Sequence, residues 1–224
     1  MQRSIEISRP STVAMSDGRG TRLLGLEAGR GFAALAVILS HVNMILAEPR
    51  FYGVQPFGGI FFKFGAGVDF FFVLSGFIIS WAHWKDIGRP DRLKHYAVRR
   101  FLRIYPPYWG VLLPLSLAYA LFPDAGQPSQ HDPVNFVFSV LLLPYPDHPI
   151  LGVAWTLVFE MAFYAMFALV ILKGRSAFLL LAAWGMFVLA ANLWLAPLPF
   201  PFSFVADVHN IEFLLGIIVA GVMR

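Results

Sequence analysis

The sequence has no cysteine and few charged residues. The absence of cysteine from its 224 residues excludes disulfide bonds, thiolate catalysis and thiolate metal sites. Charged residues make up 13% of the chain, about half of the roughly 25% that is usual in soluble domains. Hydrophobic residues make up 58%, and Phe alone occurs 23 times. Long apolar runs with polar breaks between them therefore predict an all-α, polytopic transmembrane helix bundle.

The N-terminal segment lacks the apolar core of a secretory signal. Its first residues, "MQRSIEISRPSTVAMSDGRG", are polar almost throughout. We therefore expect residues 1–22 to form a disordered cytoplasmic tail and residues 23–224 to form the transmembrane domain. The first apolar helix would then act as an uncleaved anchor.

Six apolar segments are long enough to be read as membrane spans. They lie near Leu23–Ala47, Ile60–Trp81, Pro106–Phe122, Val153–Leu172, Ala177–Ala196 and Ile211–Met223. The apolar run Val134–Pro144 is too short to cross a bilayer, and we interpret it as a short re-entrant or interfacial helix.

The basic residues predict the orientation of these spans. Four arginines precede the first span, seven basic residues lie between the second and third, two lie between the fourth and fifth, and Arg224 follows the sixth. All of these fall on one side in a six-span arrangement, while Arg50 and Lys63 fall on the other. Since cytoplasmic loops carry an excess of Lys and Arg, the N-terminus is expected in the cytoplasm.

The first span contains two polar residues that a lipid-facing helix does not need. In "EAGRGFAALAVILSHVN", Arg30 and His41 are eleven residues apart. At 100° and 1.5 Å per residue, they share one helix face and lie roughly 16 Å apart along the axis. This polar stripe is expected to face the interior of the bundle.

Two further spans carry buried acids at a similar depth. Asp69 stands in "GVDFFFVLSGF" and Glu160 in "WTLVFEMAFY". Counted from the outer ends of their spans, Asp69, Glu160 and His41 lie roughly 9–14 Å below the outer membrane edge. An unpaired charge at a helix centre costs about 2.5–3.5 kcal/mol. These groups are therefore expected to pair, to face water, or both.

Structural explanations exist for each of these residues. Arg30 could extend to the cytoplasmic interface, and His41 could be a hydrogen-bonding residue in helix packing. Asp69 and Glu160 could be partners of cations without touching substrate. Ser75, in "VLSGF", lacks the setting of a nucleophile, and with Gly76 beside it we expect close helix packing.

A cluster of arginines marks the start of the third span. In "KHYAVRRFLRIYPPYW", Arg99, Arg100 and Arg103 gather where a helix enters the bilayer. Basic residues there satisfy topology alone, but they could also bind the phosphates of an anionic substrate. The six histidines show no ligand spacing, so no metal site is predicted.

With these motifs the sequence resembles membrane-bound acyltransferase family 3, in particular its subgroup that modifies exopolysaccharides. Five stretches carry the resemblance and follow the order of the family across residues 23–221: "LEAGRGFAALAVILSHV", "AGVDFFFVLSGFIIS", "YAVRRFLRIYPPYW", "WTLVFEMAFY" and "IEFLLGIIVAG".

The resemblance implies an O-acyltransferase of the bacterial inner membrane. It would move an acyl group, usually acetyl, from cytoplasmic acyl-CoA to a sugar hydroxyl of an exported polysaccharide. Acyl-CoA would be a substrate rather than a bound cofactor. The partners would be the lipid bilayer, acyl-CoA and a carbohydrate acceptor, without nucleic acid.

The resemblance also assigns residues. Arg30 and His41 match the functional pair of the family, Arg100 and Arg103 match its RxxR arginines, and Glu160 matches the glutamate of its SLxxE stretch. Thr156 replaces the usual serine. Family members have more spans than the six predicted here, so the transmembrane domain is expected to be incomplete.

Two other functions fit the same buried polar residues. In a proton-coupled transporter or flippase, Arg, His, Asp and Glu would form a relay. In a non-catalytic remnant they would stabilise a bundle that binds a partner. Neither of these would consume a thioester.

Overall fold

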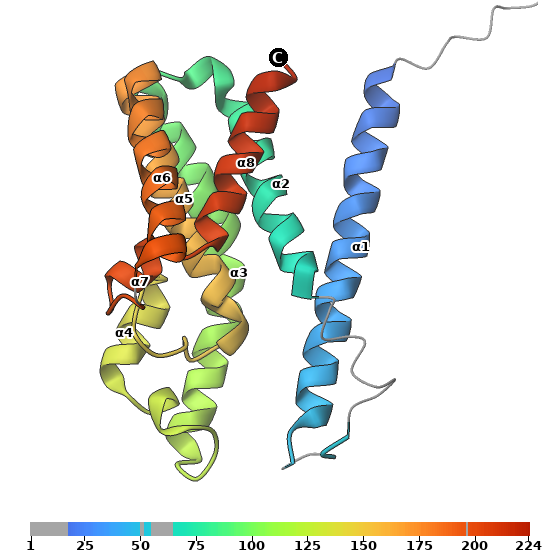
Figure 1. Ribbon diagram of the computed structural model, residues 1–224. Helices are drawn as coiled ribbons and strands as arrows, with labels where there is room; N and C mark the ends of the chain where they lie inside the picture. The colour runs from blue at the N-terminus through green and yellow to red at the C-terminus, as the bar shows by residue number, and fades with distance from the viewer. Residues whose placement is uncertain (1–17, 50–51, 55–64, 196) are drawn as a thin grey trace, which may run out of the picture. The chain divides into compact units, whose positions relative to one another are not determined.

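The computed structural model describes residues 18–49, 52–54, 65–195 and 197–224 (Figure 1). These residues form helices and connecting turns without any strand. The α-helices are α1 (Gly18–Ala47), α2 (Ala66–His83), α3 (Leu93–Leu121), α4 (Pro133–Leu141), α5 (Trp155–Lys173), α6 (Ala177–Trp194), α7 (Phe202–Val205) and α8 (His209–Val222). The chain divides into two compact units, residues 1–67 and 68–224.

The helices confirm the predicted all-α class, and several of them have the length and composition of membrane spans. Four described segments are long and apolar enough to cross a membrane: Ala28–Ala47, Ala66–Asp86, Gly152–Trp194 and Phe202–Val222. The third of them contains both α5 and α6, which are joined by a short 3-10 turn. The total of six spans stays a prediction.

Two predicted boundaries differ from the observed helices. The third predicted span, Pro106–Phe122, lies within α3, which begins earlier, at Leu93, and includes the arginine cluster. Helix α1 begins at Gly18, inside the predicted tail. Residues 1–17 and the predicted start of the second span lie outside the described residues.

The core of the second unit is built around α5. Phe163, Phe167, Val170 and Ile171 on this helix are all at most 1% exposed. The Phe163 ring stacks on that of Phe213 from α8, with centroids 4.5 Å apart. Helix α5 packs against α3, α6 and α8, which lie alongside it in Figure 1. Burial of these large side chains fixes the arrangement of the bundle.

Helices α2 and α8 approach each other at two glycines. A side-chain carbon at Gly76 would collide with the Phe213 carbonyl, and one at Gly216 with the Val73 carbonyl. Small residues let helix backbones come this close within a membrane. The close packing predicted at Gly76 is therefore confirmed.

The short helix α4 is held by side chains from α3. The hydroxyls of Tyr105 and Tyr108 donate to the carbonyls of Leu141 and Ser139, at 2.8 and 2.7 Å. The indole of Trp109 donates to the Val140 carbonyl at 2.9 Å. These bonds satisfy carbonyls that a helix end leaves without partners. Helix α4, nine residues long, is the short helix predicted here.

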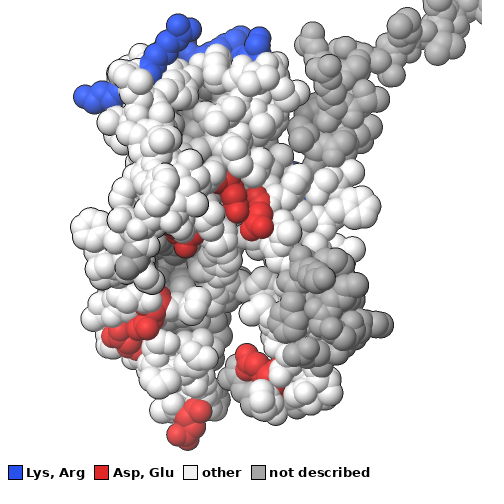
Figure 2. All heavy atoms as spheres, viewed as in Figure 1, with Lys and Arg blue, Asp and Glu red and all other residues white. Residues whose placement is uncertain are grey.

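Three basic segments of the second unit meet at one end. The turn at Gly88 touches Gly174, with a separation of 3.3 Å from the Gly174 Cα to a Cβ built at Gly88. Arg224 donates to the Trp81 carbonyl at 2.6 Å. Figure 2 shows Lys and Arg gathered at this end of the unit and acids elsewhere on the visible face. The sequence predicted that these segments share a side, while the side that faces the cytoplasm stays a prediction.

Candidate functional site

In the first unit, α1 carries both predicted site residues, Arg30 and His41. The Nδ1 atom of His41 lies 2.8 Å from the Val37 carbonyl oxygen, one turn earlier. Since a carbonyl only accepts, Nδ1 carries the hydrogen of this bond. The neutral ring then has its free lone pair on Nε2, the atom that could accept a proton. The Arg30 side chain is exposed in the structure.

In the second unit, Glu160 on α5 accepts hydrogen bonds from two neutral hydroxyls. The Ser75 Oγ atom of α2 donates to it at 3.2 Å. The Tyr164 hydroxyl, one turn further along α5, donates to the same carboxylate oxygen. Ser75 thus links α2 to α5 by a hydrogen bond, next to the helix crossing at Gly76. Hydrogen bonds of this kind stabilise a carboxylate that is removed from water.

The Glu160 site continues toward the basic end through Arg100. The guanidinium of Arg100 lies over the rings of Tyr96 and Tyr164, 5.6 and 5.4 Å from their centroids. It also donates to His83 Nε2 at 3.0 Å. His83, 5% exposed, donates from Nδ1 to Asp86 at 2.8 Å. We call the connected residues Ser75, Glu160, Tyr164, Arg100, His83 and Asp86 the Glu160 network.

The three clustered arginines therefore differ in their surroundings. Arg99 and Arg103 are exposed on α3. Arg100 points inward, and its Nε atom is buried without a hydrogen-bond partner. Of the arginines proposed to bind an anion, Arg99 and Arg103 are thus free to do so, while Arg100 is already engaged.

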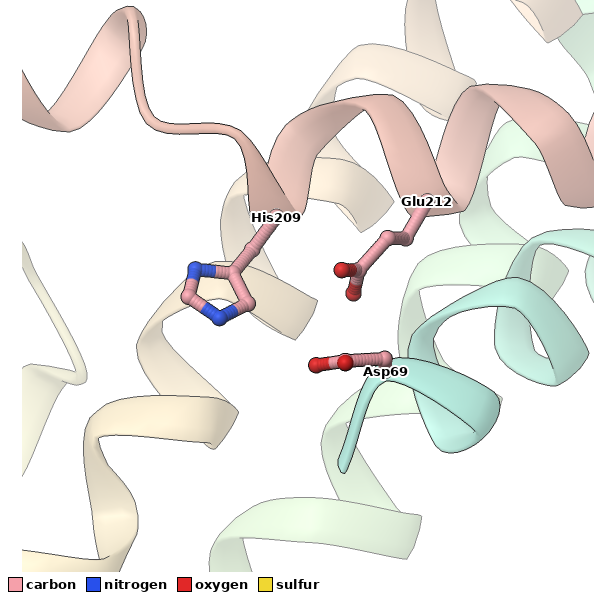
Figure 3. A group of neighbouring side chains, drawn as sticks. All are labelled: Asp69, His209 and Glu212. Atoms are coloured by element: carbon pink, nitrogen blue, oxygen red, sulfur yellow. The ribbon is translucent and has the colours of Figure 1, made fainter. Parts of the chain in front are cut away.

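Asp69 does not join Glu160 but lies with two residues of α8. Figure 3 shows Asp69 facing His209 and Glu212. One ligand atom from each of the three residues lies within 4.8 Å of the others. His209 and Glu212 are half-buried. We call Asp69, His209 and Glu212 the three-residue cluster.

The imidazole of His209 is held in place from several sides. Its Nδ1 atom lies 2.6 Å from an Asp207 carboxylate oxygen, which also accepts the His209 backbone N–H at 2.9 Å. Aromatic rings surround it, with Trp155 at 5.3 Å and Phe72 at 5.7 Å between centroids.

The start of α8 is fixed by amide and indole groups. Asn210 donates to the Phe204 carbonyl at 2.9 Å, and Trp184 of α6 donates to the Val205 carbonyl at 2.9 Å. Asn192 bridges α6 to Ala206 at 2.7 Å. The chain around α7 is thereby tied to α6, and this sets the position from which His209 enters the bundle.

Sequence reasoning did not find His209 and Glu212, although a signal was present. Glu212 stands in the quoted stretch "IEFLLGIIVAG", and an acid in an apolar span indicates a functional site as it does for Asp69. His209 comes three residues earlier and so lies on the same helix face. The proximity of His209 to Asp69, 140 residues away in the chain, could be seen only in the structure.

A cavity of about 380 Å³ opens next to Asp207. Its walls come from the loop after α4, from the first turns of α5 and from α7. Trp155, Phe159 and Phe204 provide aromatic surface, and Asp147 and Asp207 provide carboxylates. Since α5 starts at this cavity and ends at the basic segments, the two features occupy opposite ends of the second unit.

Several known proteins are similar to this chain. The exopolysaccharide production protein ExoZ of Rhizobium meliloti is 36% identical over 124 residues, which are 53% of this chain and 38% of that protein. The acyltransferase MdmB of Streptomyces mycarofaciens is 29% identical over 67% of this chain and 40% of its own length. The peptidoglycan O-acetyltransferase OatA of Listeria monocytogenes is 28% identical over 66% of this chain and 24% of its own length.

The chain thus spans at most 40% of the length of these three relatives. No solved structure matches it. The profile of the acyltransferase 3 family, described as an acyltransferase domain, matches residues 23–222. Because this match covers nearly all of the sequence, the chain belongs to the acyltransferase 3 family, which the Arg30–His41 stretch and the four other motifs predict.

Proposed function

We propose that the chain is the membrane portion of an O-acyltransferase of the bacterial inner membrane. It would transfer an acyl group, in the simplest case acetyl, from cytoplasmic acyl-CoA to a sugar hydroxyl of an exported polysaccharide. Family membership supports the reaction class, and the names of ExoZ and OatA associate relatives with exopolysaccharide and peptidoglycan.

The observation that carries this proposal is the polarity of the second unit. Basic segments gather at one end, and an aromatic cavity with carboxylates opens at the other. Acyl-CoA carries phosphate charges and cannot cross a bilayer, so its head must stay at a basic surface. Aromatic faces and carboxylates suit a sugar, which offers apolar ring faces and hydroxyl donors. The two substrates would approach from opposite ends.

At the basic end, exposed arginines would hold the donor. Arg99 and Arg103 are four residues apart on α3 and share one helix face. Their guanidinium groups can bind phosphates in a bidentate manner. Arg100 would contribute from inside, through its contacts with Tyr164 and His83.

His41 is the proposed general base. Its Nδ1 hydrogen is donated to Val37, so Nε2 is available to take the proton of the acceptor hydroxyl. The hydroxyl oxygen attacks the thioester carbonyl carbon, the new C–O bond forms and the C–S bond breaks. The proton held by His41 then passes to the departing CoA thiolate. A transient acyl group on His41 is the covalent form of the same reaction.

Arg30, Asp69 and Glu160 complete the proposed site residues. Arg30 shares the face of His41 and could hold a polar part of the donor with its planar guanidinium. Glu160 would keep the arrangement of Tyr164 and Arg100, and Asp69 would act together with His209.

The test is reconstitution of the purified chain in liposomes with acetyl-CoA that is radiolabelled in the acetyl group. Label transferred to a polysaccharide acceptor, and lost in His41→Ala, is the expected result. Acetyl-CoA that crosses the bilayer unchanged would indicate a transporter, and the absence of both would indicate a non-catalytic chain. His131→Ala is the matched control, since His131 is exposed just before α4 and does not line the cavity next to Asp207.

A further inference from the structure

The three-residue cluster contains donor atoms that converge but do not bind one another. Asp69, His209 and Glu212 each place a ligand atom within 4.8 Å of the others. Among the described residues, no hydrogen bond or ion pair joins any two of the three. Glu212 Oε2 is buried and has no hydrogen-bond partner. The space between these atoms is therefore bordered by polar groups whose bonding capacity is unused.

The orientation of His209 places one ring nitrogen on the side of Asp69. Asp207 accepts the Nδ1 hydrogen at 2.6 Å. A neutral imidazole in this tautomer has its lone pair on Nε2. In Figure 3, one ring nitrogen of His209 faces Asp69 and the other points away, and since Nδ1 is bound to Asp207, the nitrogen that faces Asp69 is Nε2. A carboxylate behind the imidazole is the usual outer contact of a metal-binding histidine.

A cation would also balance the charge of the cluster. Asp69, Asp207 and Glu212 are three acids around one histidine, and within the described part of the chain none of them forms an ion pair with Lys or Arg. The surrounding rings, including those of Phe72 and Trp155, are apolar. Carboxylates in such surroundings repel each other and are costly unless they are neutralised.

We propose that Asp69, Glu212 and His209 Nε2 bind one divalent transition-metal cation of the zinc or manganese class. An imidazole nitrogen together with two carboxylates suits these ions, whereas magnesium and calcium prefer oxygen ligands alone. The lack of cysteine excludes a thiolate site. Asp207 would act as the outer hydrogen-bond partner of the imidazole. Spacing in the sequence did not predict this site because its ligands come from two distant helices, α2 and α8.

Metal binding can be measured without acyl transfer, so the test is metal binding itself. The full chain in detergent is treated with a chelator, incubated with Zn²⁺ or, separately, Mn²⁺, and freed of unbound ion before elemental analysis. About one ion per chain is expected, following the one such cluster among the residues that the structure describes. His209→Ala and Asp69→Asn should lose this ion, and Asp207→Asn should bind it about 10–100-fold more weakly.

Glu160→Gln is the matched control, because it removes another intramembrane carboxylate that the cluster does not contain. It should retain the ion. Substitution with Co²⁺ provides a second measurement, a visible absorption spectrum that should change in His209→Ala. An ion content no higher than that of a buffer control overturns the proposal. Equal metal retention by the unmodified chain and by Asp69→Asn, a nearly isosteric change, overturns it as well.

Discussion

The Glu160 network and the three-residue cluster, both in the second unit, differ in the hydrogen bonds that their acids make. One oxygen of Glu160 accepts hydrogen bonds from Ser75 and Tyr164, and the Tyr164 ring in turn lies against the Arg100 guanidinium. Glu212 has a buried oxygen without any partner, and Asp69 and His209 face it without contact. Both acids lie on membrane-type helices. A carboxylate that is hydrogen-bonded within the protein is suited to holding structure, and one without such a partner is suited to binding a ligand.

The largest loss of stability is expected at the helix crossing that brings the three-residue cluster together. Gly216→Leu would force a side chain into the backbone of α2 at Val73. Backbone cannot move aside as a flexible side chain can, so we expect a loss of about 3 kcal/mol or more in stability. Size-exclusion chromatography in detergent should show aggregated or absent protein.

Gly110→Ala is the control for this change, because a Cβ there meets nothing within 4 Å. It should leave the elution profile unchanged. A monodisperse Gly216→Leu protein with an unchanged melting temperature would mean that the α2–α8 crossing does not hold the cluster.

The next largest loss of stability should follow removal of the Glu160 carboxylate. Glu160→Ala leaves the hydroxyls of Ser75 and Tyr164 without their acceptor. Each unsatisfied buried group costs about 1–3 kcal/mol, so a total loss of about 2–4 kcal/mol is expected. Thermal unfolding in detergent measures it, and Glu160→Gln, which keeps one acceptor oxygen, should lose less. Equal stability of Glu160→Ala and the unmodified chain would contradict a structural role.

The arginines of α3 allow a smaller and more selective test. Arg100→Ala should reduce stability by about 1–3 kcal/mol, since it removes the bond to His83 and the contacts with two tyrosine rings. Arg103→Ala, at an exposed position, should change stability by no more than about 0.5 kcal/mol. Its effect should instead be a higher KM for acyl-CoA with little change in kcat. If Arg103→Ala lowered stability and Arg100→Ala only raised KM, the Glu160 network would end before Arg100.

The smallest change in stability is expected at the three-residue cluster in metal-free protein. Glu212→Gln removes a charge that no described residue neutralises and keeps the shape of the side chain. Stability should stay within about 0.5 kcal/mol or rise, because an uncompensated buried charge is removed. Melting temperatures after chelator treatment measure this. A loss as large as that of Glu160→Ala would mean that the two clusters do not differ in the way described.

Much of the fold followed from apolar runs, because a segment that must bury its backbone in lipid is readable from composition alone. The helical class, the short helix near Val134–Pro144 and the gathering of basic segments were predicted in this way. Asp69 and Glu160 were found as isolated acids in apolar spans, but not their partners. The hydroxyl of Tyr164 and the imidazole of His83 look like ordinary side chains in the sequence, and only packing gives them a carboxylate or an arginine to bind.

Boundaries were less predictable than elements. The third span was placed from Pro106 because the arginines before it are charged, yet α3 continues through them from Leu93. A helix does not have to end where the membrane ends. Hydropathy indicates only which part of the helix lies in the lipid. The pairing of Asp69 with α8 depended on a tertiary crossing that no local pattern encodes.

The glycine crossing of α2 and α8 has a mechanical consequence. Asp69 lies seven residues before Gly76, and Glu212 lies four before Gly216, so each acid is within about two helical turns of the point where the backbones interlock. Helices adapt to a thinner or thicker bilayer mainly by tilting. Locked at this point, α2 and α8 would tilt as one rigid body, and the spacing of the three donor atoms should be insensitive to lipid thickness.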